Sequence, residues 1–344
     1  MRTELLFPSS SSPPRLAHRE SLPRKDPRPL LCRTFHRIPR STSSPDLIFS
    51  TYVLNVAVGG SQQFPLQLDT GSSDLVCPPL PLFPQSQLTQ IQWIASTSCT
   101  TCDSAGNRLY DPSGSLDAGE HFEINYIAGG AAGPIVWDKV SIGGYTILHQ
   151  ALGMPDLTRS SPQRPHPEPL AAAGEVKDEP LDAFSGILGL AFPLNSVITS
   201  KLRAGDPVGA DGATWASNLF GMDGAPDSRF VSILLERPGS TKVPSLLGIG
   251  RHPVDLVPDP SKIHYSNILS EGNGAMFWKI SVTAITVYVD GVRKDINIGP
   301  SNSGSAFPTA VLDTGVPVIL ATSDIANGIY GALDIHPARD GSCE

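Results

Sequence analysis

Two stretches of the sequence end in the same tripeptide: Phe64-Pro65-Leu66-Gln67-Leu68-Asp69-Thr70-Gly71-Ser72-Ser73 and Ala310-Val311-Leu312-Asp313-Thr314-Gly315-Val316-Pro317-Val318. In each, a run of apolar, strand-like residues stops at an aspartate that Thr and Gly follow. Such an acid lies on a tight turn, at the floor of the cleft that the strands line. By average residue usage, one such tripeptide arises by chance in roughly one chain in ten of this length, and two arise in well under one in a hundred. The pair therefore predicts two half-sites that meet, with Asp69 and Asp313 as the candidate carboxylates.

Composition favours an all-β protein. The chain has 344 residues, enough for one large or two ordinary domains with a sizeable core, and 40% of them are hydrophobic. Its 33 prolines and 32 glycines separate many short β-branched runs, as in proteins built from strands and turns. No apolar run approaches the length of a membrane span, so we expect none.

Charge is divided unevenly along the chain. Residues 1–40 hold nine Lys and Arg against three Asp and Glu, whereas the whole chain carries −8, so the remainder carries −14. An acidic body repels nucleic acid, which excludes it as a partner. Residues 1–45 are rich in Ser, Pro and Arg without any period, and we interpret them as a disordered basic tail.

Cysteine usage gives no metal site. Cys99 and Cys102 form a lone Cys-x-x-Cys without a second pair, which is a poor zinc site. A small loop disulfide is the preferred interpretation, and free thiols are the alternative. The histidines are scattered, and none lies at a spacing that predicts catalysis with Cys, Glu or Ser.

Strand and turn signals organise the rest of the chain. A hairpin over residues 52–69 turns at Gly59-Gly60 and leads into Asp69. The proline-rich residues 155–182 predict an exposed insertion. The remaining expected elements are strands around 122–127 and 135–142 that flank a glycine-rich 128–133, a buried strand and turn at 184–193, a second strand set that starts with 230–235 and 245–250, a hairpin that turns at Asp290-Gly291, and a short amphipathic helix at 322–333.

With these features in order, the chain resembles the pepsin-like aspartic endopeptidases from about Tyr52 to Cys343. The resemblance rests on the two acid turns, the Tyr126 hairpin, Phe184-Ser185-Gly186-Ile187-Leu188-Gly189-Leu190, and Trp278-Lys279-Ile280-Ser281-Val282. It implies a two-lobed, all-β double barrel with one acid turn per lobe. The N-terminal lobe would span residues 46–235, and a partial C-terminal lobe would span residues 236–344.

The resemblance also implies an activity: aspartic-type hydrolysis of peptide bonds by an Asp69/Asp313 dyad and an activated water. Two facing carboxyl groups share one proton, so one acts as general base and the other as acid. It implies a polypeptide substrate, a monomer, no cofactor or metal, and a secreted or vacuolar location, although no signal peptide is evident. The supporting residues would be Thr70 and Thr314, which join the two turns, Gly71 and Gly315, which admit substrate, Ser72, which binds Asp69, Tyr126 on a flap over the cleft, and a disulfide between Cys99 and Cys102.

Several positions depart from the family pattern. Val316 replaces a hydroxyl residue, Val76 replaces a Trp that partners the flap tyrosine, and Ile127 with Ala128 replace the usual flap tip. The family continues well past the second acid turn, so we expect an incomplete second lobe, with the partner of Cys343 missing. The alternative function is an inactive fragment or pseudoenzyme that at most binds peptides. The basic tail is interpreted as unstructured or as a mispredicted first exon, with a prosegment remnant as the alternative.

Overall fold

The computed structural model describes residues 2–6, 32–40, 49–76, 110–126, 130–154, 186–202, 213–236, 243–301 and 307–335, and most of their regular structure is β. The strands are β1 (Arg2–Leu6), β2 (Cys32–Arg40), β3 (Phe49–Val58), β4 (Gln62–Asp69), β5 (Leu75–Val76), β6 (Leu116–Asn125), β7 (Gly130–Ile142), β8 (Tyr145–Gly153), β9 (Ile187–Gly189), β10 (Phe230–Leu234), β11 (Ser245–Ile249), β12 (Lys279–Ser281), β13 (Ile285–Val289), β14 (Val292–Ile296) and β15 (Thr309–Val311). The helices are α1 (Val197–Lys201), α2 (Trp215–Gly221) and α3 (Ser323–Ala332), with 3-10 turns η1 (Pro112–Gly114), η2 (Pro193–Asn195) and η3 (Pro260–Lys262). Among the described helices, none has the length and apolar content to cross a membrane.

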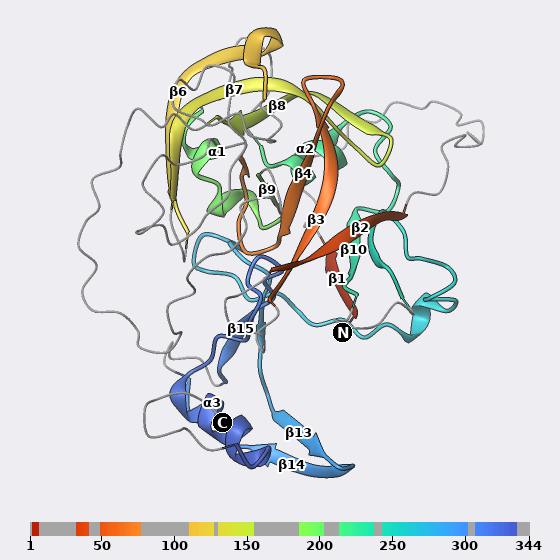
Figure 1. The fold of residues 1–344 in the computed structure, drawn as a ribbon, viewed down its shortest axis with the longest axis vertical. Helices are drawn as coiled ribbons and strands as arrows, with labels where there is room; N and C mark the ends of the chain where they lie inside the picture. The colour runs from red at the N-terminus through yellow and green to blue at the C-terminus, as the bar shows by residue number, and fades with distance from the viewer. Residues whose placement is uncertain are drawn as a thin grey trace.

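A closed barrel forms the first lobe. β3 pairs with β4, β4 runs parallel to β9, and the order continues through β5, β8 and β7 until β7 pairs back with β3. Closure leaves no unpaired edge within this ring of strands. The expected hairpin between β3 and β4 is present, and it turns at Gly59 and Gly60, whose φ angles of 63° and 91° suit glycine. In Figure 1, β6, β7 and β8 cross the end of the molecule opposite β13, β14 and α3.

The main core lies inside this barrel. Along β4, the side chains of Phe64, Leu66 and Leu68 are fully buried, and they alternate with Pro65 and Gln67 on the other face. Burial of such side chains is the main favourable term in folding. The face of β4 that carries Pro65 and Gln67 is therefore the one available to contact the second lobe.

The N-terminal segments differ from expectation. We expected residues 1–45 to be disordered, whereas residues 2–6 and 32–40 within this range form β1 and β2. β1 pairs with β10, and β2 lies between β11 and β3 in the same large sheet. The edges of β3, β10 and β11 present backbone groups that need partners, a requirement that composition does not reveal.

β10 and β11 also differ from expectation. We expected them to start a second strand set, but they belong to the large sheet that contains the first-lobe strands. Their side chains Val231, Ile233, Leu247 and Ile249 join the main core. The boundary that we placed at residue 235 thus falls within this sheet, between β10 and β11.

The second lobe is incomplete. It contains the pairs β12–β15 and β13–β14, together with α3. The expected hairpin at Asp290-Gly291 and the expected helix near 322–333 are confirmed. Within the described residues 251–335, the buried apolar side chains are Trp278 and Ala332.

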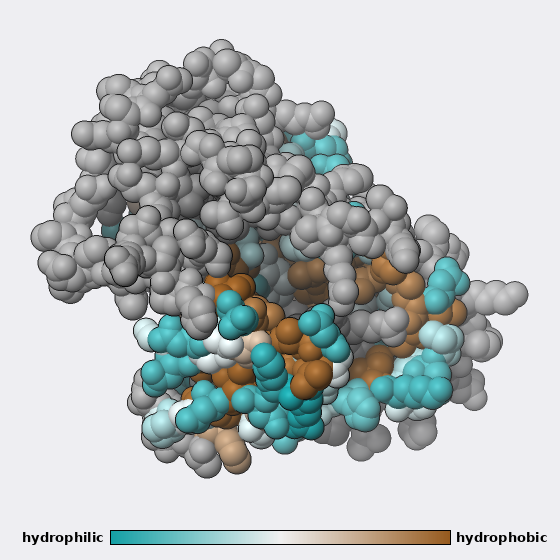
Figure 2. Space-filling model, turned by 60° about the horizontal axis from the view of Figure 1, so that its bottom comes forward, coloured by the Kyte–Doolittle hydropathy of each residue, from teal (hydrophilic) through white to brown (hydrophobic). Residues whose placement is uncertain are grey.

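Apolar side chains on this lobe reach the solvent. Ile319 is 87% exposed and Leu320 is 64% exposed, directly after the second acid turn. Figure 2 shows apolar surface between hydrophilic residues on the face that includes this end of the molecule. A lobe with a closed barrel would bury such residues, so their exposure agrees with an incomplete second lobe.

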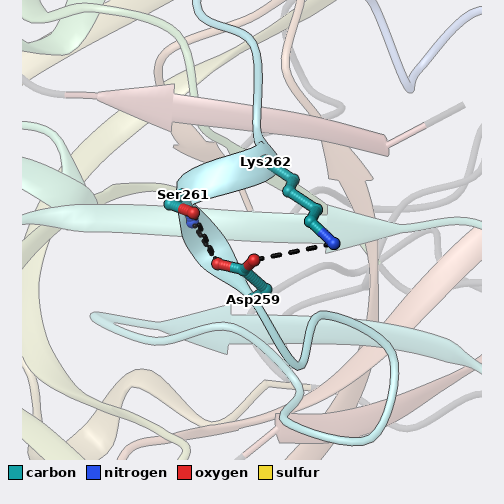
Figure 3. Close-up of polar contacts among 3 residues, drawn as sticks. All are labelled: Asp259, Ser261 and Lys262. Atoms are coloured by element: carbon teal, nitrogen blue, oxygen red, sulfur yellow. Dashed lines mark hydrogen bonds and ion pairs between the residues drawn. The ribbon is translucent and has the colours of Figure 1, made fainter.

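The connection from β11 to β12 carries a polar turn, η3. Asp259 accepts hydrogen bonds from the backbone N and the Oγ of Ser261, and it lies 3.7 Å from Lys262 Nζ (Figure 3). Both charged side chains are exposed, so the ion pair adds little stability. The hydrogen bonds to Ser261 define the turn.

Candidate active site

Asp69 is the last residue of β4, and the parallel strand β9 fixes its backbone. Leu68 lies opposite Leu188 and Asp69 lies opposite Gly189, and the backbone N of Leu190 then donates to Asp69 O at 2.7 Å. A Cβ at Gly189 would lie 2.5 Å from the backbone N of Asp74. The glycine is therefore required for this close approach, and the first acid turn is clamped on β9.

Reciprocal hydrogen bonds join the two acid turns. Thr70 Oγ1 donates to Leu312 O at 2.7 Å, and Thr314 Oγ1 donates to Leu68 O at 2.6 Å. Each hydroxyl also accepts from the backbone N of the other threonine, at 3.0 and 3.2 Å. The turns, 244 residues apart in sequence, are thus held together by side chains from both sides.

Each glycine lies against the carboxyl group of the opposite turn. A Cβ on Gly71 would lie 2.1 Å from Asp313 Oδ2, and a Cβ on Gly315 would lie 2.5 Å from Asp69 Oδ1. Neither position has room for a side chain. The structure therefore brings the two predicted carboxyl groups into one site, where the Asp69 and Asp313 side chains share a hydrogen bond.

Asp69 is buried, and its pKa is raised to about 6. Burial is the largest cause, and the charge of Asp313 comes second. Two hydrogen bonds oppose the rise in pKa: Ser72 Oγ donates to Oδ2 at 2.5 Å and the backbone N of Gly71 donates to Oδ1 at 2.8 Å, whereas a hydrogen bond with the Asp313 side chain adds to the rise. Asp69 thus holds a proton in mildly acidic solution, where an ordinary aspartate has lost it.

The surroundings of Asp313 are different. It is half-buried, and its Oδ1 accepts the backbone N of Gly315 at 2.8 Å. The residue that corresponds to Ser72 is Val316, which has no hydroxyl to donate. The two carboxyl groups therefore have unequal hydrogen-bond environments.

Tyr126 directly follows β6, in the hairpin that β6 forms with β7. Burial raises the pKa of its hydroxyl well above 10, and the charges of Asp69 and Asp74 act in the same direction. Its hydroxyl is thus within the electrostatic influence of the candidate site. We predicted that residues 128–133 lie at or near the tip of this hairpin, and residues 130–133 form the start of β7, with Gly130 opposite Asn125. Residues 127–129 lie outside the described residues.

Gln67 was missed by the sequence reasoning. Its Nε2 donates to Gly315 O at 2.9 Å, across the lobes, and the side chain is buried. Because side chains alternate along a strand, Gln67 shares a face of β4 with Asp69. A polar residue two positions before the acid, in an otherwise apolar run, was the available signal.

Asp74 was also missed. Its buried carboxylate accepts hydrogen bonds from Ser196 Oγ at 2.5 Å, Val197 N at 2.9 Å and Ile198 N at 3.2 Å. It thereby binds the segment after the first acid turn to the start of α1. Burial raises the pKa of Asp74, and these hydrogen bonds oppose the rise. No spacing in the sequence indicated this contact.

Trp278 connects the two lobes behind the site. Its Nε1 donates to Leu190 O at 2.8 Å, and its ring packs on Phe192 with centroids 4.2 Å apart. Its carbonyl accepts Leu312 N at 3.0 Å. A path of hydrogen bonds therefore runs from Asp69 through Leu190 and Trp278 to the residue before Asp313. The sequence analysis included Trp278 in a family motif without giving it this role.

Most of the remaining residues singled out in the sequence lie outside the described part of the chain. Cys99, Cys102 and Cys343, and the positions Ile127 and Ala128, lie outside the described residues. Val76 is fully buried in β5. Across the described ranges, no group of three or more His, Cys, Asp or Glu residues could hold a metal ion.

A barrel lobe joined to a second acid turn, with two facing carboxylates between them, defines the class of bilobal aspartic peptidase folds. The sequence matches the family model for eukaryotic aspartyl proteases over residues 51–342, and the chain belongs to this family. Among the solved structures, the aspartic proteinase of Irpex lacteus has a similar fold, with a TM-score of 0.50 and 18% identity. The match covers 89% of this chain and 70% of that one.

Curated relatives carry related names. Mucorpepsin of Rhizomucor miehei is 27% identical over 70% of this chain and 48% of its own length. Major aspartyl peptidase 1 of Cryptococcus neoformans is 24% identical over 83% of this chain and 49% of its own length. Pepsin-2B of Gadus morhua is 24% identical over 82% of this chain and 69% of its own length. The chain spans about half the length of the first two.

Proposed function

We propose that this chain carries the catalytic dyad of an aspartic-type endopeptidase, which hydrolyses peptide bonds in extended polypeptides. The observation that carries the proposal is the mutual packing of the two acid turns. The carboxyl groups of Asp69 and Asp313 each lie against the glycine of the other turn, so a single small molecule between them could contact both.

The proposed reaction needs one proton on the pair. The ionised carboxylate removes a proton from a water molecule as its oxygen attacks the carbonyl carbon of the peptide bond. The protonated carboxyl gives its proton to the carbonyl oxygen, forming a tetrahedral intermediate. The carboxyl group that took the water proton then gives it to the amine nitrogen as the C–N bond breaks, and the other carboxylate takes back a proton from a hydroxyl of the intermediate, which restores the single shared proton. A carboxyl whose pKa is raised to about 6, as that of Asp69 is, supplies the shared proton in mildly acidic solution.

Supporting roles follow for the neighbouring residues. Ser72 and the backbone N of Gly71 bind the oxygens of Asp69 and hold the plane of its carboxyl group. Thr70 and Thr314 fix the separation of the turns through their reciprocal hydrogen bonds. Tyr126 would close over the bound polypeptide as part of the flap.

The test is cleavage of an unfolded polypeptide by purified protein at acid pH, with a statine-type inhibitor as control. We expect inhibitor-sensitive cleavage, and we expect Asp69→Asn and Asp313→Asn each to abolish it without loss of the fold. Cleavage that survives in Asp69→Asn would exclude this mechanism. The chain is expected to be far less active than its longer relatives, because little of the second lobe packs around Asp313 and small misplacement of a catalytic group is costly in rate.

A second candidate function is peptide binding without cleavage. Two observations favour it: Val316 gives Asp313 no hydroxyl support, and apolar side chains of the second lobe are left in solvent. Calorimetry separates the candidates, because a binding protein would bind the inhibitor and an extended peptide yet release no fragments. Cleavage by the same preparation would refute this second function.

A further inference from the structure

Gln67 has a place in the site that the proposed function does not use. β4 presents Gln63, Pro65, Gln67 and Asp69 on one face and its core residues on the other. On the first of these faces, burial increases along the strand: Gln63 is exposed, Pro65 is half-buried, and Gln67 and Asp69 are buried. The face becomes covered only where the second acid turn lies against it.

A glutamine at such a position must satisfy its polar groups, because an unpaired buried amide is costly. Gln67 Nε2 donates to Gly315 O, 2.9 Å away and 248 residues distant in sequence. An apolar side chain would fill the same space without this requirement. The amide therefore adds a directional contact to an interface that packing alone could cover.

The accepting residue is at the centre of the site. The backbone N of Gly315 binds Asp313 Oδ1 at 2.8 Å, and its Cα faces Asp69, so that an added Cβ would lie 2.5 Å from Asp69 Oδ1. Any movement of Gly315 thus changes the position of one carboxyl group and the packing of the other. Gln67 holds the carbonyl of this same residue.

We propose that Gln67 is a positioning residue, whose amide locks the second acid turn against the first and so sets the separation of the two carboxyl groups. The hydroxyl groups of Thr70 and Thr314 donate to the carbonyls of Leu312 and Leu68, and each accepts the backbone N of the other threonine. Gln67 binds the second turn beyond its aspartate. This contact at Gly315 lies one residue beyond the threonine pair, so it holds the turn against rotation about that pair. The catalytic consequence rests on the proposed function, whereas the structural link does not.

The test compares Gln67→Met, which keeps the length of the side chain and removes the donor, with Gln150→Leu. Gln150 is a matched control: it is also buried, and its Nε2 donates to Ala213 O at 3.2 Å, in contact with α2 instead of the acid turns. Carbon-13 NMR of labelled aspartate follows the titration of Asp69. Hydrogen exchange followed by mass spectrometry reports on the peptide that covers residues 311–317.

In Gln67→Met we expect the Asp69 midpoint to move toward the ordinary value of aspartate, because the charge of Asp313 acts from a greater and more variable distance. Exchange in residues 311–317 should become at least about fivefold faster, as expected for the loss of a hydrogen bond of ordinary strength. Gln150→Leu should change neither. An unchanged Asp69 titration and unchanged exchange in a folded Gln67→Met variant would overturn the proposal.

Activity separates this proposal from the proposed function. If the unmodified chain cleaves polypeptide, Gln67→Met should lower kcat about tenfold or more with a small change in KM, because its defect lies in the dyad geometry. If the unmodified chain cleaves nothing, the proposed function fails. The NMR titration of Asp69 and the hydrogen exchange of residues 311–317 still decide the role of Gln67. Gln67→Leu is the second variant if Gln67→Met does not fold.

Discussion

Substitution of Asp69 by Asn should remove much of the dependence of stability on pH. The pKa of Asp69 rises from 3.8 to about 6 on folding, chiefly through burial. A carboxyl with a raised pKa in the folded state stabilises that state while it is protonated. This contribution is fully present below about pH 4 and is lost as the pH rises through 6.

The size of the effect follows from the shift. At about 1.4 kcal/mol per pH unit, the rise corresponds to about 3 kcal/mol of unfolding free energy between acid and neutral pH. The side chain is only 7% exposed, so solvent screens it little. Asparagine keeps an oxygen for the backbone N of Gly71 and an amide that can donate to Ser72, so the fold should survive.

Urea unfolding at pH 3.5, 5 and 7 measures this directly, provided that one transition is observed. Asp69→Asn should match the unmodified protein at pH 3.5 and exceed it at pH 7. Asp313→Asn should reduce the pH dependence only in part, because the charge of Asp313 is the smaller cause of the shift. Asp223→Asn, which changes an exposed carboxylate, serves as the control. Parallel loss of stability from pH 3.5 to 7 in Asp69→Asn and the unmodified protein would refute the reasoning.

Three further predictions concern packing around the dyad. Gly71→Ala should abolish cleavage and alter the aspartate NMR titration, because its Cβ would collide with Asp313 at 2.1 Å, whereas Gly114→Ala, in open space, should change neither. Trp278→Phe should lower the unfolding free energy by about 1–3 kcal/mol in urea, since it leaves a buried carbonyl without its indole donor; an unchanged midpoint would contradict this. Ile319→Asp, at a side chain 87% exposed, should reduce self-association in light scattering while changing the unfolding free energy by about 0.5 kcal/mol or less, and persistent association would show that another surface is responsible.

The acid turns could be predicted because their signal is local. In both, an apolar run stops at Asp-Thr-Gly, and the alternation of β4 ends with Asp69 at the lobe interface. Hairpins with Gly59-Gly60 or Asp290-Gly291 at their turns were predictable for the same reason, since positive φ angles restrict the residues that can occupy them.

The errors concern contacts between segments that are distant in sequence. β1 and β2 pair with β10, β11 and β3, and no local pattern reveals which strand edge is available. Gln67 looked like an interruption in an apolar strand, because its partner is 248 residues away. We expected the strand after the flap to start near residue 135, whereas Gly130–Gly133, whose composition is typical of turns, already pairs with β6. Strand pairing outweighed local propensity in that segment.

The two acid turns are supported unequally, and the inequality has a consequence for catalysis. The first turn has its own lobe around it: β9 binds its backbone, Ser72 binds its carboxylate, and Asp74 binds the helix behind it. In the second turn, the side chains that bind the backbone across the interface come from the first lobe, Thr70 and Gln67, while β12 and the carbonyl of Trp278 hold the residues before Asp313.

Association of the lobes, more than the small core of the second lobe, therefore positions Asp313. A perturbation that loosens the second lobe while leaving the cross-lobe hydrogen bonds intact should preserve the dyad. Loss of those bonds should separate the carboxyl groups even in a folded chain. For this protein, the interface between the two turns is thus the part of the structure on which any hydrolytic activity depends.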